Sequence, residues 1–398
     1  MEVRARAPGK IILSGEHAVV HGSTAVAAAL NLYTSVSVLF SSDGDNMLKL
    51  ELKDMELEFS WPIEKIKEVL PDFKSPSPST PLTCSTDIFK SITSLIEEQS
   101  FPEAKIELAN GVVAFLWLYT AIQGYKPGTV TVTSELPLGA GLGSSAAFCV
   151  ALSGALLALS ECCELEDSQQ GWVSFRNSSL DLVNKWAFEG EKIIHGRPSG
   201  IDNTVSTYGN MIQFKSGELK RLKSSVPVKM LITNTKVGRN TKALVAGVSE
   251  RTLRHPDAMA SVFNAVDSIS KELSIIIQTP ASDDISVTEK EEKLVELMEM
   301  NQGLLQCMGV SHATIETIIR ITLKYKLCSK LTGAGGGGCV LTLLPTLLSS
   351  IVVDKVVGEL ESCGFECFIA AIGGNGMETG GGPDVRGVFA LAFLQIFE

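Results

Sequence analysis

The sequence lacks an excess of positive charge. Its 398 residues include 34 lysines and arginines against 45 aspartates and glutamates, which gives a formal net charge of −11. Proteins that bind nucleic acids or anionic membranes gain much of their affinity by neutralising phosphates with basic side chains. The composition therefore argues against a nucleic-acid or membrane partner, and a bound anion would have to be met by local groups.

Cysteine spacings typical of metal sites are also missing. The nine cysteines form no CxxC pair and show no ligand-like spacing with the five histidines, so free thiols in a reducing compartment are expected. His17 and His21 lie four residues apart, but Ala18 stands where an HExxH motif has its glutamate, which disfavours zinc.

No long apolar run is present either. Residues 1–8 contain no apolar stretch of the kind that a secretory signal requires. The uncharged stretch 136–160 begins with turn-forming residues and leaves 16 residues from Ser145, whereas a bilayer crossing needs about 20. We therefore expect a cytoplasmic protein in which this stretch forms a buried helix.

Length and hydrophobic periodicity predict about two domains that mix helices and strands. In the first half, the patterns predict strands over 3–7, 32–40, 48–52 and 57–59, a Pro/Ser-rich loop over 71–81, and helices over 113–122 and 180–194, the latter capped by Ser178 or Ser179. In the second half, they predict a hairpin over 210–222, a strand over 229–234, helices within 257–278, 288–308 and 313–325, and a strand, helix and strand over 339–372. The domain boundary is placed near residue 225.

The most informative segment is ELPLGAGLGSSAA, from Glu135 to Ala147. It joins a β-type stretch, 130–134, to an Ala/Leu-rich helical stretch, 145–160, so its glycines fall where a helix begins. Free N–H groups and the positive end of the helix dipole meet there, and glycines let the backbone approach phosphate oxygens. The segment predicts a nucleotide site, with a tight structural turn as the alternative. It is neither a Walker A loop nor G-x-G-x-x-G, because Ser144 follows its last glycine.

A second polar segment lies near the N-terminus. Lys10 comes directly after a Pro8-Gly9 turn, and Glu16 and His17 follow a further glycine. Polar side chains on turns between apolar residues suggest a site, and a solvated Lys10 is the alternative that the spacing leaves open.

Two carboxylates lie within residues 189–204. Glu191 follows Ala187 by four residues and Val183 by eight, so it lies at the edge of the apolar stripe of the predicted helix and points inward. Its partner is either Mg²⁺ or an internal ion pair. Asp202 follows a Pro-Ser-Gly turn among apolar neighbours, where an acid can act as a base; an Asx turn or a helix cap is the alternative.

A third segment, 330–339, holds five glycines within six positions. This density is costly in backbone entropy for an ordinary hairpin. It indicates close approach to a ligand or to the first glycine loop.

Together these segments resemble the superfamily of small-molecule kinases that includes galactokinase, homoserine kinase and mevalonate kinase. PGKIILSGEHAVVHG, ELPLGAGLGSSAA and KLTGAGGGGC are similar to its three signature motifs. Within it, NKWAFEGEKIIHGRPSGIDNTVS and LITNTKVGRNTKALVAGV are similar to the mevalonate kinases. The resemblance extends over residues 1–372 and is weak over 41–110.

The resemblance implies an α+β fold with the ATP site in the cleft between two domains. These are an N-terminal mixed α/β kinase domain over 1–225 and a C-terminal ferredoxin-like domain over 226–372, followed by a glycine-rich, apolar tail over 373–398. It further implies ATP- and Mg²⁺-dependent phosphorylation of the C5 hydroxyl of mevalonate, a step of isoprenoid and sterol biosynthesis, by a homodimer.

Site roles follow from the same resemblance, residue by residue. Asp202 matches the catalytic base, and Lys10 matches the lysine beside it that also contacts the phosphoryl group. Ser145 and Glu191 match the Mg²⁺ ligands. Glu16, His17 and Arg239 match substrate contacts, Arg239 facing the mevalonate carboxylate. The residues implied to bind ATP are Lys10, Ser134, Gly139, Ala140, Gly141, Leu142, Gly143, Ser144 and Ser145.

Two alternatives stay open at this point. One is a sister enzyme of the same fold, either phosphomevalonate kinase or the ATP-dependent diphosphomevalonate decarboxylase. The other is a non-catalytic nucleotide-binding relative. The combination of Lys10, Glu191 and Asp202 favours an active enzyme of the mevalonate kinase type.

Overall fold

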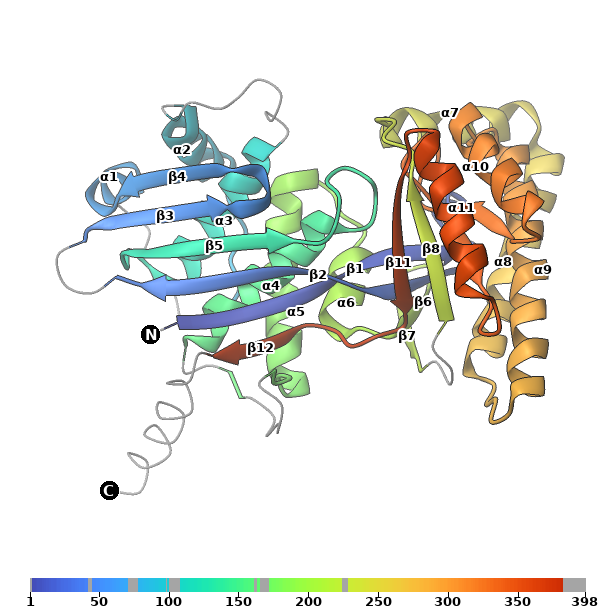
Figure 1. The fold of residues 1–398 in the computed structure, drawn as a ribbon. Helices are drawn as coiled ribbons and strands as arrows, with labels where there is room; N and C mark the ends of the chain where they lie inside the picture. Colours follow the sequence, from blue (N-terminus) through green and yellow to red (C-terminus); the bar gives the residue numbers. More distant parts are fainter. Residues whose placement is uncertain are drawn as a thin grey trace.

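The computed structural model describes residues 2–41, 45–70, 78–97, 99, 108–160, 163–164, 172–223 and 228–381. They form two halves placed side by side, each with strands packed against helices (Figure 1). The boundary predicted near residue 225, most of the loop predicted over 71–81 and the tail from residue 382 onward lie outside the described residues.

The N-terminal half is built on a mixed sheet in the order β4-β3-β5-β2-β1-β12, in which β3 and β5 are parallel. Its strands are β1 (Glu2–Ser14), β2 (Ala25–Phe40), β3 (Met47–Leu52), β4 (Leu57–Pro62), β5 (Gly128–Ser134) and β12 (Glu378–Gly381). Its helices are α1 (Ile63–Val69), α2 (Thr86–Glu97), α3 (Ala109–Gln123), α4 (Ser144–Ala158), α5 (Asn177–His195) and α6 (Ile201–Tyr208). Because valines alternate with threonines along β5, Val130 and Val132 face the core, which α3, α4 and α5 complete.

Strand β1 continues through Pro8 and Gly9, so the turn predicted there is wrong. The register between β1 and β2 shifts between Pro8 and Lys10, which marks a β-bulge. An added Cβ at Gly9 would lie 2.7 Å from the Leu142 carbonyl oxygen, so only glycine lets the strand approach this closely. The bulge thereby brings Lys10 against the glycine loop before α4.

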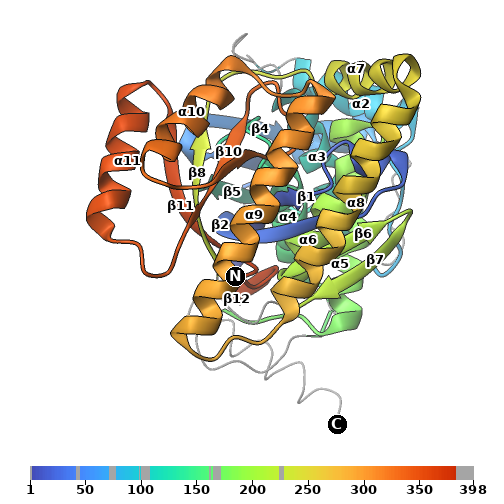
Figure 2. The same ribbon diagram turned by 90° about the vertical axis from the view of Figure 1, so that its right-hand side faces the viewer.

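The C-terminal half has the β-α-β-β-α-β connectivity of a ferredoxin-like domain, as expected. Its four antiparallel strands follow the order β11-β8-β10-β9. The strands are β8 (Val228–Asn234), β9 (Ser329–Leu331), β10 (Cys339–Leu344) and β11 (Glu366–Ile372). The helices are α7 (Thr241–Arg254), α8 (Pro256–Gln278), α9 (Asp284–Met308), α10 (Ala313–Lys324) and α11 (Ser350–Ser362). Figure 2 shows α8 and α9 running side by side along this half.

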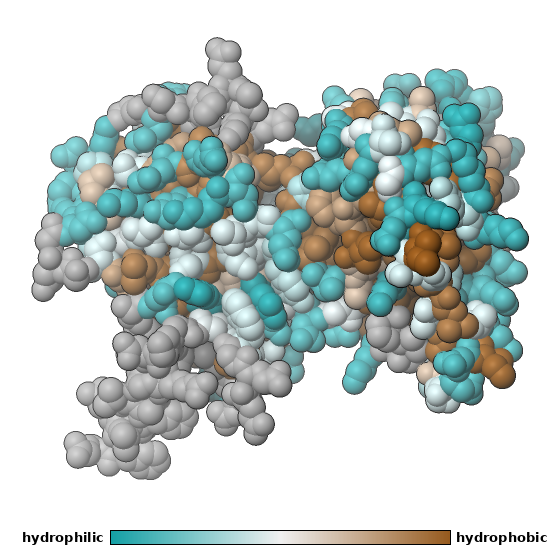
Figure 3. Space-filling view, in the orientation of Figure 1, coloured by the Kyte–Doolittle hydropathy of each residue, from teal (hydrophilic) through white to brown (hydrophobic). Residues whose placement is uncertain are grey.

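The long strands β1 and β2 join the two halves. One end of β2 pairs with β5, and the other pairs with β6 (Met211–Lys215) and β11. A shared core contains Ile11 and Leu13 of β1 together with Leu273 of α8 and Leu297 of α9. Hydrophobic side chains accordingly gather where the halves meet (Figure 3). The junction is therefore a packed interface that fixes the position of the β1 residues.

Several local predictions differ from the structure. The helices α1, α2, α6 and α7 were not predicted. Helix α5 begins at Asn177 without a side-chain cap, so the predicted Ser178 or Ser179 cap is wrong; Ser179 is instead buried and accepts a hydrogen bond from the Glu164 N–H. The hairpin of β6 and β7 (Glu218–Leu222) is confirmed. Strand β12 pairs with β1 although it lies within the predicted tail. Among the described helices, none has the length and apolar character needed to cross a bilayer.

Candidate active site

The glycine loop between β5 and α4 presents the start of a helix. Gly139, Gly141 and Gly143 have φ angles of 67°, 83° and 75°. Helix α4 begins at Ser144, and no side chain of the described residues caps its N-terminus. The first N–H groups of the helix are therefore not taken by a capping side chain, and this geometry suits an anion.

Lys10 lies on β1 directly against this loop. Its backbone N–H donates to the Leu142 carbonyl over 2.7 Å. Its side chain passes Gly143, where an added Cβ would lie 2.8 Å from Lys10 Cγ. The ammonium ends 3.1 Å from Oδ1 of Asp202, which is 35% exposed in the first turn of α6. The structure thus brings the predicted base and lysine together.

Glu191 on α5 is almost completely buried, with 2% of its side chain exposed. Burial raises the pKa of its carboxyl to about 7; the nearby charge of Asp202 adds to the rise, while Ser145 and Lys10 oppose it. Within the described residues, Glu191 Oε1 has no hydrogen-bond partner. Its contact with His195 Nε2 is 3.9 Å long, so Glu191 forms no close ion pair within the part of the chain that the structure describes.

Sequence reasoning missed His195, the last residue of α5. Its Nε2 lies 2.9 Å from Ser145 Oγ. Burial lowers the pKa of the imidazole. A signal was available, because His195 follows Glu191 by four residues and therefore lies on the same face of the helix.

The oxygen donors of Ser145 and Glu191 fit a hard divalent cation. Mg²⁺ is commonly held by one or two carboxylates while waters and phosphate oxygens complete its shell. The unpartnered Oε1 of Glu191 and the adjacent hydroxyl supply such donors. In the described part of the chain, no group of three or more His, Cys, Asp or Glu side chains could hold a metal by itself. His17 and His21 do not converge, since His17 bonds the Ala334 carbonyl and His21 stacks on Phe263.

Arg239, after β8, lies between the two glycine loops. An added Cβ at Gly141 would lie 1.6 Å from Arg239 Nη2, so a larger residue there would displace the guanidinium. An added Cβ at Gly338 would lie 2.8 Å from Nη1 and 3.1 Å from the Ala140 carbonyl oxygen, so the second loop packs against the first. Nη1 is buried and has no partner among the described residues, and burial lowers the pKa of the guanidinium. Arg239 is thus a half-buried cation whose Nη1 has unused donor capacity among the described residues, beside the loop before α4.

Glu16 and His17 have partners inside the protein. Glu16 forms an ion pair of 2.5 Å with Lys330, and neither side chain is exposed. Asn301 donates to the second carboxylate oxygen over 3.3 Å. His17 Nε2 lies 2.8 Å from the Ala334 carbonyl oxygen in the second glycine loop. Both residues therefore tie the end of β1 to the C-terminal half.

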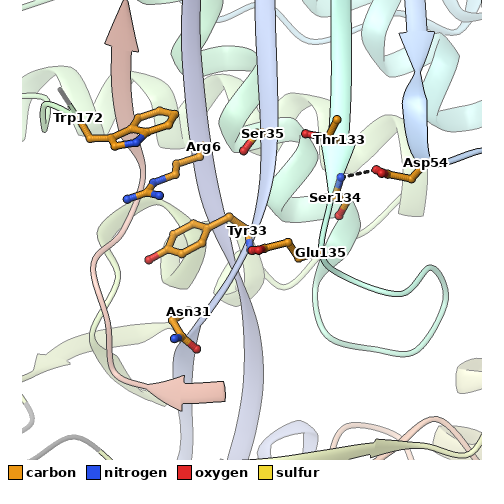
Figure 4. A pocket seen from close by; sticks show the side chains of 9 residues that line it. All are labelled: Arg6, Asn31, Tyr33, Ser35, Asp54, Thr133, Ser134, Glu135 and Trp172. Atoms are coloured by element: carbon orange, nitrogen blue, oxygen red, sulfur yellow. Dashed lines mark hydrogen bonds between the residues drawn. The ribbon is translucent and has the colours of Figure 1, made fainter. Parts of the chain in front are cut away.

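A surface pocket of about 480 Å³ lies where the glycine loop starts (Figure 4). It is lined by Arg6, Asn31, Tyr33, Ser35, Asp54, Thr133, Ser134, Glu135 and Trp172. The Arg6 guanidinium lies over the rings of Tyr33 and Trp172, and Glu378 neutralises its charge. Asp54 accepts a 2.5 Å hydrogen bond from the Ser134 N–H. Ser134 thus lies at a polar pocket beside the glycine loop.

Comparison with known proteins identifies the family. The family model for the GHMP kinases N terminal domain matches residues 108–210, and that for GHMP kinases C terminal matches residues 288–374. A mevalonate kinase of Arabidopsis thaliana is 64% identical over 382 residues, covering 95% of this chain and 99% of the relative. The chain belongs to the mevalonate kinase family. The mevalonate kinase of Homo sapiens is 40% identical over 386 residues, covering 93% of each chain.

Two solved structures share the fold of this chain. The crystal structure of L. major mevalonate kinase in complex with R-mevalonate aligns with a TM-score of 0.64 at 22% identity, covering 96% of each chain. Lactococcus lactis galactokinase complexed with galactose aligns with a TM-score of 0.59 at 15% identity, covering 94% of each chain. As a member of the mevalonate kinase family, the protein is a phosphotransferase that uses ATP.

Proposed function

We propose that this protein transfers the γ-phosphoryl group of ATP to the C5 hydroxyl of (R)-mevalonate, giving 5-phosphomevalonate and ADP. The observation that carries the proposal is the Lys10–Asp202 pair, 3.1 Å apart, beside the uncapped start of α4. Phosphoryl transfer asks the protein mainly to position the groups and stabilise charge. A base, a cation and a phosphate cradle within one site support that reaction.

Asp202 acts as the base of this reaction. A carboxylate oxygen takes the proton of the attacking hydroxyl as the new O–P bond forms. Lys10 holds this carboxylate in place, and its ammonium stabilises the negative charge on the alkoxide and the transferring group. Because Lys10 is only 8% exposed, its charge is poorly screened by water and acts strongly at this distance.

The backbone from Gly139 to Ser145 cradles the ATP phosphates, and Ser145 and Glu191 would hold Mg²⁺. When bound, Mg²⁺ would neutralise charge on the phosphates. The unpartnered, buried Oε1 of Glu191 supports this role.

The nucleoside part of ATP lies in the pocket beside Ser134. Asp54 and Glu135 line this pocket and Arg6 is already neutralised, so the pocket suits a neutral base and ribose hydroxyls better than phosphates.

Arg239 is the substrate-side cation. Its unpartnered Nη1 beside the glycine loops supports contact with an anion, either the mevalonate carboxylate or a phosphate. Glu16 and His17 lie behind this site, since Glu16 is engaged by Lys330 and the Nε2 of His17 by the Ala334 carbonyl. A cytosolic location, a homodimer and a place in isoprenoid and sterol synthesis remain predictions.

An acceptor panel tests the proposed function. ADP release is measured with (R)-mevalonate, 5-phosphomevalonate and 5-diphosphomevalonate in parallel, and only mevalonate is expected to support it. Preference for 5-phosphomevalonate, or release of CO₂ and inorganic phosphate from 5-diphosphomevalonate, would assign a sister activity. The Asp202→Asn variant serves as the control for background ATP hydrolysis, and no ADP release with any acceptor would identify a non-catalytic relative.

A further inference from the structure

We propose that His195 is a positioning residue that orients the Ser145 hydroxyl for divalent-cation binding. The inference rests on the metal role proposed above for Ser145 and Glu191. His195 ends α5 with its Nε2 at 2.9 Å from Ser145 Oγ, which is hydrogen-bond distance. The contact joins the end of one helix to the start of another, α4.

The direction of this hydrogen bond matters for a ligand. A serine hydroxyl has one proton and two lone pairs. When Ser145 donates its proton to His195 Nε2, the lone pairs of Oγ are free to face a cation. When the proton points toward Glu191 instead, it stands between the two oxygens that the cation must share. An acceptor at Nε2 therefore selects the hydroxyl orientation that binds metal.

The hydrogen bond between Ser145 Oγ and His195 Nε2 can run in either direction, depending on which ring nitrogen carries the proton. With that proton on Nδ1, Nε2 accepts the hydrogen bond from Ser145.

His195 acts on the ligands and is not itself a ligand. Mg²⁺ strongly prefers oxygen, so an imidazole nitrogen is a poor ligand for it. The distance from Nε2 to Glu191 Oε1, 3.9 Å, is too long for a hydrogen bond and leaves that oxygen available. Half of the His195 side chain is exposed whereas Glu191 is buried, so His195 is the outer member of the three. Partners of this kind behind a metal ligand typically change affinity by about 10–100-fold.

Direct cation binding tests the proposal. Free Mn²⁺ is measured by electron paramagnetic resonance, with the full-length protein and AMP-PNP and without mevalonate. The variant His195→Leu removes the acceptor at similar bulk and is expected to weaken Mn²⁺ binding about 10–100-fold. His195→Gln, whose amide oxygen can accept from Ser145, is expected to recover most of the affinity. Lys185→Ala, on the exposed face of the same helix, is the matched control and should bind as the unmodified protein does.

Three results would overturn the proposal. The first is unchanged Mn²⁺ affinity in His195→Leu, and the second is an equal loss in His195→Leu and His195→Gln. The third is a further loss when His195→Leu is added to Ser145→Ala, because a residue acting through Ser145 should then have no effect.

Glu191→Gln separates this inference from the metal site: if it does not weaken Mn²⁺ binding, the proposed site itself fails. If thermal unfolding shows that His195→Leu does not fold, His195→Asn, which is too short to reach Ser145, replaces it.

Discussion

Two lysine–carboxylate pairs each take one member from the same short stretch of chain, and they have different roles. Lys10, on β1, lies 3.1 Å from Asp202, and Glu16, two residues beyond the end of β1, lies 2.5 Å from Lys330. The paired groups are chemically alike, and both lysines are buried. The difference between the pairs therefore lies in their surroundings.

The Glu16–Lys330 pair is buried, and its hydrogen-bonding groups are already taken by partners inside the protein. Lys330 also donates to the carbonyls of Leu331 at 2.7 Å and Ile12 at 3.5 Å, so three acceptors meet its three protons. Asn301 bonds the other oxygen of Glu16, and no part of either charged side chain is exposed. Asp202 is instead 35% exposed and can reach a ligand. Access and unused hydrogen-bonding capacity, rather than residue type, distinguish a pair that can do chemistry from one that holds the halves together.

The largest effect, on turnover, is expected from removing the carboxylate of the partly exposed Lys10–Asp202 pair. Asp202→Asn keeps the size of the side chain but cannot accept a proton, so turnover should fall by about 10²–10⁴-fold. Coupled measurement of ADP release gives the rate, and thermal unfolding checks that the protein is folded. Turnover close to that of the unmodified protein would remove Asp202 from the mechanism.

Removing the charge of Glu16 from the buried Glu16–Lys330 pair should lower the stability of the protein instead. Glu16→Gln leaves the Lys330 ammonium buried without a counter-charge, which should lower the free energy of unfolding by about 3–5 kcal/mol. Urea unfolding measures the loss, and kcat at saturating substrates should stay close to normal for the folded fraction. The double variant Glu16→Leu/Lys330→Leu should recover most of the stability, because it removes both charges. A raised KM for mevalonate without loss of stability would show instead that Glu16 contacts the substrate.

Glu191 provides a third case, in which one carboxylate oxygen has no hydrogen-bond partner among the described residues, and it should show a pH dependence. Its folded pKa is about 7 and its ordinary value is 4.5, so the metal-free folded state binds the proton more tightly than the unfolded chain does. The free energy of unfolding should therefore fall as pH rises from about 4.5 to about 7, by roughly 3 kcal/mol. The difference between the unmodified protein and Glu191→Gln, measured by urea unfolding in EDTA, isolates this contribution. Parallel pH curves for the two proteins would contradict it.

The smallest effect is expected at an exposed pair of similar geometry. Arg176 and Glu164 lie 2.6 Å apart, but their side chains are 61% and 66% exposed. Water and salt screen such a pair, so Glu164→Gln should change the free energy of unfolding by less than about 1 kcal/mol. A loss as large as that of Glu16→Gln would show that burial does not separate the two cases.

Much of the fold could be predicted locally. The alternation of β5, the hairpin of β6 and β7, and the helices α8 to α10 follow from periodicity and turn residues that lie within each element. The bulge at Pro8-Gly9 escaped prediction, because a proline followed by a glycine usually marks a turn and its fit depends on the distant Leu142 carbonyl. Helix α6 escaped because its eight residues are too few for a clear periodic signal.

The sequence by itself determined the family, the two glycine loops and the residue types available for chemistry, because these are written in contiguous motifs. Only the tertiary structure decided that Lys10 pairs with Asp202, that Glu16 forms a buried ion pair with Lys330 and that His195 lies at hydrogen-bond distance from Ser145. It also decided that Glu191 is buried with an unused oxygen. Such pairings and their desolvation arise when segments far apart in the chain pack together, and no local pattern encodes the distance or the dielectric between them.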